Sequence, residues 1–222
     1  MVLFTGDTHG DVTRIVHAIH RFALRKDDVI VILGDVGLNY YGNDRGDRDR
    51  KKKLNSKGVP ILCIHGNHER RPATLKTYKA IEWHGGKVYV EEGLPNLLFA
   101  IDGEVYDLDG QKAIAIGGAY SVDKFYRLAR GYSWFPDEQP DEETKARVEA
   151  KWPPWTGRLT WCFLILARRV TYQLRPFCQA WTNLLSTIAP RSGWIPLRTD
   201  WLMVIGSAVI GTSIKDWNTS VS

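Results

Sequence analysis

The sequence lacks any long apolar run and holds few cysteines. Its longest apolar stretches, Trp161–Ala167 and Trp201–Gly211, are much shorter than the ~20 residues of a membrane helix, so we expect no membrane span. No basic segment followed by an apolar one opens the chain, so we expect no signal peptide. The three cysteines, Cys63, Cys162 and Cys178, have no framework spacing, which predicts no disulfide scaffold and suits a protein of the reducing cytoplasm.

Histidine and glutamate are missing from residues 151–222. The last histidine is His84 and the last glutamate is Glu149. Seven of the nine tryptophans follow residue 150, where 8 Lys and Arg accompany 2 Asp and Glu, whereas residues 1–150 hold 22 and 23. Since the net charge of +5 comes from the tail, it does not indicate a nucleic-acid surface on the rest of the chain. We therefore predict a core domain at residues 1–150 and an aberrant, Trp-rich basic tail at residues 151–222.

Apolar runs and turn residues predict an α/β fold for the first 150 residues. The order strand, turn, helix, strand at this spacing predicts a βαβ layer with a largely parallel sheet. The predicted elements are strands at Val2–Thr5, Val29–Leu33 and Val59–Ile64, a helix at Val12–Leu24 capped by Asp11, an antiparallel meander of Val88–Val90, Leu97–Ile101, Glu104–Leu108 and Ala113–Ile116, and a polar helix at Pro140–Lys151.

Three of these strands end in glycine followed by residues of metal-ligand type. The segments are GDTHGD at residues 6–11, GDVG at residues 34–37 and GNHE at residues 66–69. Side chains at the carboxyl ends of neighbouring strands converge on one crevice of an open α/β sheet, and glycine lets the backbone turn sharply there. Carboxylate and amide oxygens with imidazole nitrogens suit Mn, Fe, Zn or Mg. The pattern predicts a metal site, and two such ions about 3.5–4 Å apart can promote phosphoryl transfer.

The three segments, in this order and 28 and 32 residues apart from Asp7 to Asp35 and from Asp35 to Asn67, resemble the first motifs of calcineurin-like metallophosphoesterases over residues 1 to about 150. The resemblance implies an α/β sandwich of two facing sheets flanked by helices. It implies hydrolysis of phosphomonoesters or phosphodiesters with two divalent metals, manganese favoured, and a phosphoprotein, nucleotide or small molecule as substrate. The implied roles are Asp7 and His9 on the first metal, Asp35 bridging both, Asn67 on the second, and His68 as catalytic acid or stabiliser of the charge on the phosphate.

Taken one at a time, these residues have simpler explanations, since Asp7 and Asp35 can cap helices or form turns. Among the other histidines, we expect a structural role for His65, surface positions for His17 and His20, and a turn at His84. The charged run Arg45–Lys53 interleaves acids with bases and contains no aromatic residue. We therefore interpret it as a solvated helix face rather than a nucleic-acid patch.

The tail departs from the resemblance, because the family's C-terminal Ser-His and Gly-His-x-His motifs, which follow strands of the second sheet and complete the metal shells, are missing. We therefore expect a sandwich incomplete at its C-terminal end and impaired metal binding. Back-translation in a shifted frame permits Val/Leu-Val-Leu-Ser-His-Thr-Cys-Pro at Thr160–Arg168, a family-like segment at Phe177–Thr187, and Cys-Gly-His-Trp-His at Ser207–Thr212. Our hypothesis is a frame slip near Lys151–Trp152; the alternative is a genuine but divergent C-terminal domain.

Two other classes of function stay open. One is a catalytically dead remnant that binds phosphate or protein and shows no turnover. The other is a nucleic-acid-binding module that uses Arg45–Lys53 and the basic tail, with steeply salt-dependent affinity. We rank nucleic acid last, because the charge bias lies in the aberrant tail.

Overall fold

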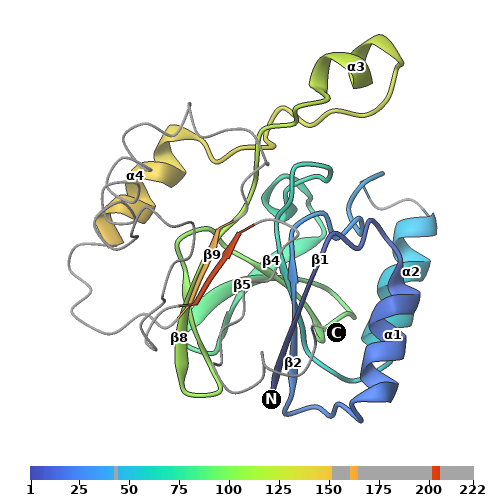
Figure 1. The fold of residues 1–222 in the computed structure, drawn as a ribbon, viewed down its shortest axis with the longest axis vertical. Helices are drawn as coiled ribbons and strands as arrows, with labels where there is room; N and C mark the ends of the chain where they lie inside the picture. Colours follow the sequence, from blue (N-terminus) through green and yellow to red (C-terminus); the bar gives the residue numbers. More distant parts are fainter. Residues whose placement is uncertain (43–44, 152–160, 165–201, 206–222) are drawn as a thin grey trace, which may run out of the picture.

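The computed structural model describes residues 1–42, 45–151, 161–164 and 202–205. Most of the predicted tail, residues 151–222, therefore lies outside the described residues. The described residues form two sheets with helices on the outside (Figure 1). This arrangement confirms the α/β two-sheet fold that the motifs implied.

The larger sheet has six strands in the order β1-β2-β3-β6-β5-β4. The strands β1, β2, β3 and β6 run parallel, and β5 and β4 pair antiparallel at the far edge. The bounds are β1 Val2–Gly6, β2 Val29–Leu33, β3 Ile61–Ile64, β4 Tyr78–Trp83, β5 Gly86–Glu91 and β6 Leu97–Ala100.

The smaller sheet has the order β10-β9-β8-β7, in which β7 and β8 form an antiparallel hairpin and β9 and β10 continue parallel to β8. The bounds are β7 Val105–Leu108, β8 Gln111–Ile116, β9 Trp161–Leu164 and β10 Leu202–Ile205. The sequence predicted a second sheet without its closing strands. Two described strands from beyond residue 150 nevertheless extend this sheet.

Strand β2 shows how the sandwich is packed. All five of its side chains are buried, and they alternate between two apolar clusters. Ile30 and Ile32 face the cluster under the helices, whereas Val29, Val31 and Leu33 face the cluster that includes residues of β7 and β8. A strand buried on both faces requires a continuous apolar run, which is what this segment provides.

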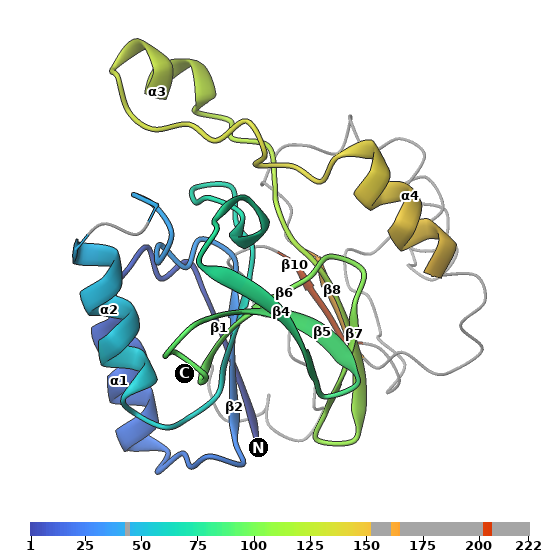
Figure 2. The same cartoon turned by 180° about the vertical axis from the view of Figure 1, so that it is seen from behind.

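Helices α1 (Val12–Arg21) and α2 (Arg45–Asn55) lie side by side on the outer face of the larger sheet, and α4 (Glu142–Lys151) lies on the opposite side of the molecule (Figures 1 and 2). Asp11 caps α1, as expected, by accepting a hydrogen bond from the Thr13 N–H at 3.0 Å. Apolar side chains of α1, among them Ile15 and Ile19, are buried against the sheet.

The expectation that the charged run forms a solvated helix face is only partly right. The segment is helical, as α2, and Lys52 and Lys53 are exposed. Asp47 and Lys51, however, are fully buried, and Lys51 Nζ lies 2.8 Å from Glu91 Oε2 on β5. One face of α2 is therefore buried, and its lysine is paired with a carboxylate of β5. A count of the charges in the segment does not reveal this pairing.

Two further elements differ from the sequence expectation. The predicted meander is divided, since β5 and β6 belong to the larger sheet and β7 and β8 to the smaller one. The strand β4 and the short helix α3 (Lys124–Ala129) were not predicted. Helix α3 projects beyond both sheets and has no buried residue (Figures 1 and 2).

Candidate metal centre

Three strand ends bring the predicted site together. In the parallel register Gly6 pairs with Leu33 and Leu33 pairs with Ile64, so β1, β2 and β3 end at the same edge of the sheet. The loops that follow are joined by backbone hydrogen bonds, from His9 N–H to Asp35 O and from Gly10 N–H to Val36 O, both at 2.8 Å. The convergence expected from the sequence is therefore present.

Three side chains at this edge form a group able to hold a metal ion. One ligand atom from each of His9, Asp35 and His68 lies within 4.8 Å of the others. The closest contacts are His68 Nδ1 to Asp35 Oδ2 at 3.3 Å and His9 Nε2 to Asp35 Oδ2 at 3.9 Å. Two imidazoles and a carboxylate are a donor set for divalent transition metals. The chemistry of the residues therefore fits the implied metal.

The backbone at the predicted ligands adopts an uncommon conformation. Asp7, His9 and Asp35 have φ values of 44°, 45° and 43°, and they are three of the six non-glycine residues with positive φ in the described part of the chain. A non-glycine residue whose backbone is in the left-handed region is strained by about 1–3 kcal/mol, and such residues cluster at functional sites. Their grouping at one sheet edge supports a functional rather than a merely structural role for these loops.

The electrostatics couple Asp35 and His68. Burial on its own would raise the pKa of Asp35, but hydrogen bonds from the His68 ring and backbone N–H and the charges of His68 and His9 outweigh it, so the pKa is lowered. The Asp35 hydrogen bond raises the pKa of His68 against the opposing effects of burial and Arg127, and Asp123 adds to the rise. The fold thus favours the charged forms of both side chains.

Glycine is required in two of the motifs because the loops touch. A Cβ on Gly66 would lie 2.1 Å from Asp35 N and 2.2 Å from Asp35 Oδ1. A Cβ on Gly37, whose φ is +71°, would lie 2.4 Å from Gly10 N and 2.5 Å from the His9 carbonyl carbon. Any side chain at either position would displace a predicted ligand.

Glu69 joins the second and third motifs, a role that the sequence analysis did not predict. Its buried carboxylate accepts hydrogen bonds from the N–H groups of Gly66, Val36 and Gly37 at 3.1–3.2 Å. Burial, with a further contribution from the Asp35 charge, raises the pKa of Glu69 to about 7 against these hydrogen bonds. The available sign of this role in the sequence was the position of Glu69 directly after His68 in the third motif.

Asp7 lies in the loop after β1 but outside the three-residue group, and Asn67 lies in the loop after β3. The group of His, Cys, Asp and Glu ligand atoms does not include the Asp7 carboxylate, and the carbonyl oxygen of Asp7 lies 3.4 Å from Arg14 Nη2. Asn67 donates from Nδ2 to Ser121 Oγ at 2.9 Å. Their assignment as metal ligands stays a prediction.

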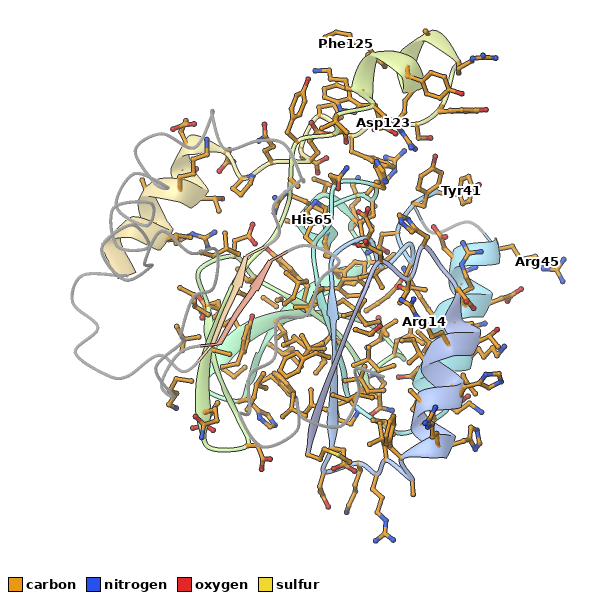
Figure 3. The ribbon with its side chains drawn as sticks, viewed as in Figure 1. Arg14, Tyr41, Arg45, His65, Asp123 and Phe125 are labelled. Atoms are coloured by element: carbon orange, nitrogen blue, oxygen red, sulfur yellow. The ribbon has the colours of Figure 1, made fainter. Side chains whose placement is uncertain are left out.

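The segment after β8 supplies neighbours that the sequence did not reveal. Asp123 Oδ1 lies 3.5 Å from His68 Nε2, and Arg127 donates to the Tyr40 hydroxyl at 3.0 Å. Figure 3 shows Asp123 on the side of α3 nearer the sheets and Phe125 on the far side. Asp123, which precedes α3, and Arg127 on α3 thus face the centre, whereas Phe125 is exposed.

The remaining histidines lie where the sequence analysis expected them. His65 is buried, and burial, followed by the charge of Arg71, holds its pKa well below the usual value. His17 and His20 are exposed on α1. His84 has a φ of 48°, and its Nδ1 lies 2.7 Å from Asp107 O. None of these four belongs to the metal-binding group found among the described residues.

The fold and the site define an α/β protein with a candidate metal centre at the carboxyl ends of parallel strands. The chain belongs to the calcineurin-like phosphoesterase family, whose model matches residues 1–175. Family membership confirms the resemblance, and calcineurin-like phosphoesterases as a class are metal-dependent hydrolases. A search of curated proteins found no match. Among the described residues, no helix is long and apolar enough to cross a membrane.

Proposed function

We propose that this chain is built to hydrolyse phosphomonoesters or phosphodiesters through a dinuclear metal site. The observation that carries the proposal is the convergence of His9, Asp35 and His68 at three strand ends in a family of phosphoesterases. Two bound divalent ions, manganese favoured, would supply Lewis-acid stabilisation of the phosphoryl group. In this proposal Asp7, His9, Asp35 and Asn67 are the ligands.

His68 is proposed as the catalytic acid or as a stabiliser of the developing charge. Its Nδ1 faces Asp35 and its Nε2 faces Asp123. The raised pKa of the His68 ring favours a protonated imidazole, which can give a proton to a leaving oxygen or neutralise negative charge on the phosphate. Half-buried between two carboxylates, the ring is also held in a restricted orientation.

The test is Mn²⁺-dependent hydrolysis of an aryl phosphate by the chain whose tail is replaced by its shifted-frame translation, because the missing histidines are expected to impair the chain as it stands. Asp35→Asn is the control, because it keeps the size of the side chain and removes the charge that pairs with both histidines. Activity that depends on Mn²⁺ and is lost in Asp35→Asn supports the proposal. Activity that survives in Asp35→Asn, or that persists without divalent metal, contradicts it.

The tail is proposed to result from a reading-frame slip near Lys151–Trp152 that impairs this chain. No histidine follows His84 in the sequence, so three C-terminal ligands that the resemblance implies are missing. Strand β9 ends at Leu164, where the shifted frame permits the histidine of Ser-His, and β10 ends at Ile205, a few residues before the segment that permits Gly-His-Trp-His. The placement of both strands in the second sheet supports the hypothesis, since the family's histidines follow strands of that sheet.

The nucleotide sequence of the gene tests the frame slip. An uninterrupted shifted frame that encodes Ser-His and Gly-His-Trp-His supports it, whereas a stop codon or other residues at those positions refutes it. Impaired metal binding also makes a catalytically dead, phosphate- or protein-binding remnant the second candidate. That remnant would bind Mn²⁺ or phosphate weakly and show no turnover.

A further inference from the structure

Ser121 lies against one of the proposed metal ligands. Its side chain is 1% exposed, and its Oγ accepts a hydrogen bond from Asn67 Nδ2 at 2.9 Å. The two residues are 54 positions apart in the sequence, so only the fold brings them together. The contact joins the loop after β3 to the segment after β8.

The direction of this hydrogen bond fixes what Asn67 can offer to a cation. An asparagine side chain has one acceptor oxygen and one NH₂ donor at opposite sides of a planar amide. When Nδ2 donates to Ser121, Oδ1 is presented on the other side. Only Oδ1 can bind a metal ion, so an amide held by Ser121 through Nδ2 presents its ligating oxygen.

The segment that carries Ser121 is itself fixed on the loop after β3. The Gly118 N–H donates to His65 O at 2.7 Å. A Cβ on Gly117 would lie 2.8 Å from the same carbonyl oxygen, so the two backbones are in close contact. Ser121 is therefore held at a defined position relative to Asn67, as an orienting residue must be.

We infer that Ser121 is a positioning residue of the metal centre, which orients the Asn67 amide for metal binding. The inference rests on the proposed function, because it requires that Asn67 bind a metal. Partners that orient a ligand in this way contribute about 10- to 100-fold to metal affinity. The sequence motifs around Gly66 and Asn67 give no sign of this residue.

The experiment measures Mn²⁺ dissociation constants by electron paramagnetic resonance of the free ion, for the full chain and four variants. Ser121→Ala removes the acceptor, Ser121→Thr keeps a hydroxyl, and Asn67→Ala and the double variant complete a cycle. We expect about 10- to 100-fold weaker binding in Ser121→Ala and affinity within about threefold of the parent in Ser121→Thr. In the Asn67→Ala background, Ser121→Ala should have no further effect beyond about twofold, because the residue acts through Asn67.

Two results overturn the inference while leaving the metal centre in place. One is unchanged Mn²⁺ affinity in Ser121→Ala. The other is an equal loss of affinity when Ser121→Ala is made in the Asn67→Ala background, which is the behaviour of a residue that only supports the fold. Thermal unfolding of each variant separates this case from global destabilisation. A parent chain that binds no Mn²⁺ overturns the proposed metal centre itself, and the inference with it.

Discussion

The ion pair between Lys51 and Glu91 provides a quantitative test of how helix α2 is packed. Lys51 Nζ lies 2.8 Å from Glu91 Oε2, and the two side chains are 0% and 11% exposed. At an effective dielectric constant of about 20, two unit charges at this separation attract by about 6 kcal/mol. Desolvation offsets much of this attraction, but removing one partner leaves the other charge buried alone, which costs about 3–5 kcal/mol. We therefore expect Lys51→Met to lower the free energy of unfolding by about 3–5 kcal/mol.

Urea unfolding followed by circular dichroism measures this change. Lys53→Met is the matched control, because Lys53 is exposed on the same helix and should change stability by no more than about 0.5 kcal/mol. Adding Glu91→Leu to Lys51→Met should recover part of the loss, since no charge is then left unpaired. A loss below about 1 kcal/mol in Lys51→Met, or an equal loss in both lysine variants, would refute the buried ion pair. It would favour the interpretation of this helix face as solvated.

Three smaller predictions concern the loops and the first helix. Gly66→Ala should cost about 1–3 kcal/mol and abolish Mn²⁺ binding in calorimetry, because the new Cβ would lie 2.1 Å from Asp35 N; retained affinity would contradict the packing of these loops. The pKa of His65 is held well below its usual value, so the unfolded chain takes up a proton first as the pH falls below about 6.5, and stability should fall by up to about 1.4 kcal/mol per pH unit. His65→Asn should flatten this slope, and an equal slope in the variant would contradict the assignment. Asp11→Ala should lower stability by about 0.5–2 kcal/mol in thermal unfolding, because it removes the N-cap of α1, whose carboxylate accepts from the Thr13 N–H; no loss would show that the cap is unimportant.

The sequence predicted the layer that carries the site, because its signals are local. Val29–Leu33 needs no partner information to be recognised as a strand, and the structure has it with these bounds. The glycine and ligand residues at each strand end also predicted that the loops converge. His9, Asp35 and His68 do lie together. The order of the motifs was sufficient for this part of the fold.

The arrangement of the later strands could not be predicted, because it depends on distant pairing. Four short strands between Lys87 and Gly118 looked like one meander, but the pairing of β6 with β3 and of β8 with β9 divides them between the two sheets. The burial of Lys51 is a similar case, since its partner Glu91 is 40 positions away. A charged helix with one buried face has the same local pattern as a solvated one.

The parts of the site that the sequence missed share this cause. Ser121 and Asp123 contact Asn67 and His68 from a segment more than 50 residues further along the chain. No motif joins these positions. Asp7 is a residue that the sequence analysis predicted but the structure does not place in the group. Its motif predicted a metal ligand, whereas its carboxylate is outside the three-residue group.

The central claim is that this chain is a metal-dependent phosphoesterase impaired by its tail. The most direct measurement compares Mn²⁺-dependent hydrolysis of an aryl phosphate by three proteins: the chain itself, the chain with its tail replaced by the shifted-frame translation, and that repaired chain with Asp35→Asn. The account predicts little or no turnover in the first, strong Mn²⁺-dependent turnover in the second, and loss of that turnover in the third. Equal activity with either tail would contradict the impairment, and activity of the repaired chain that survives Asp35→Asn would contradict the metal centre.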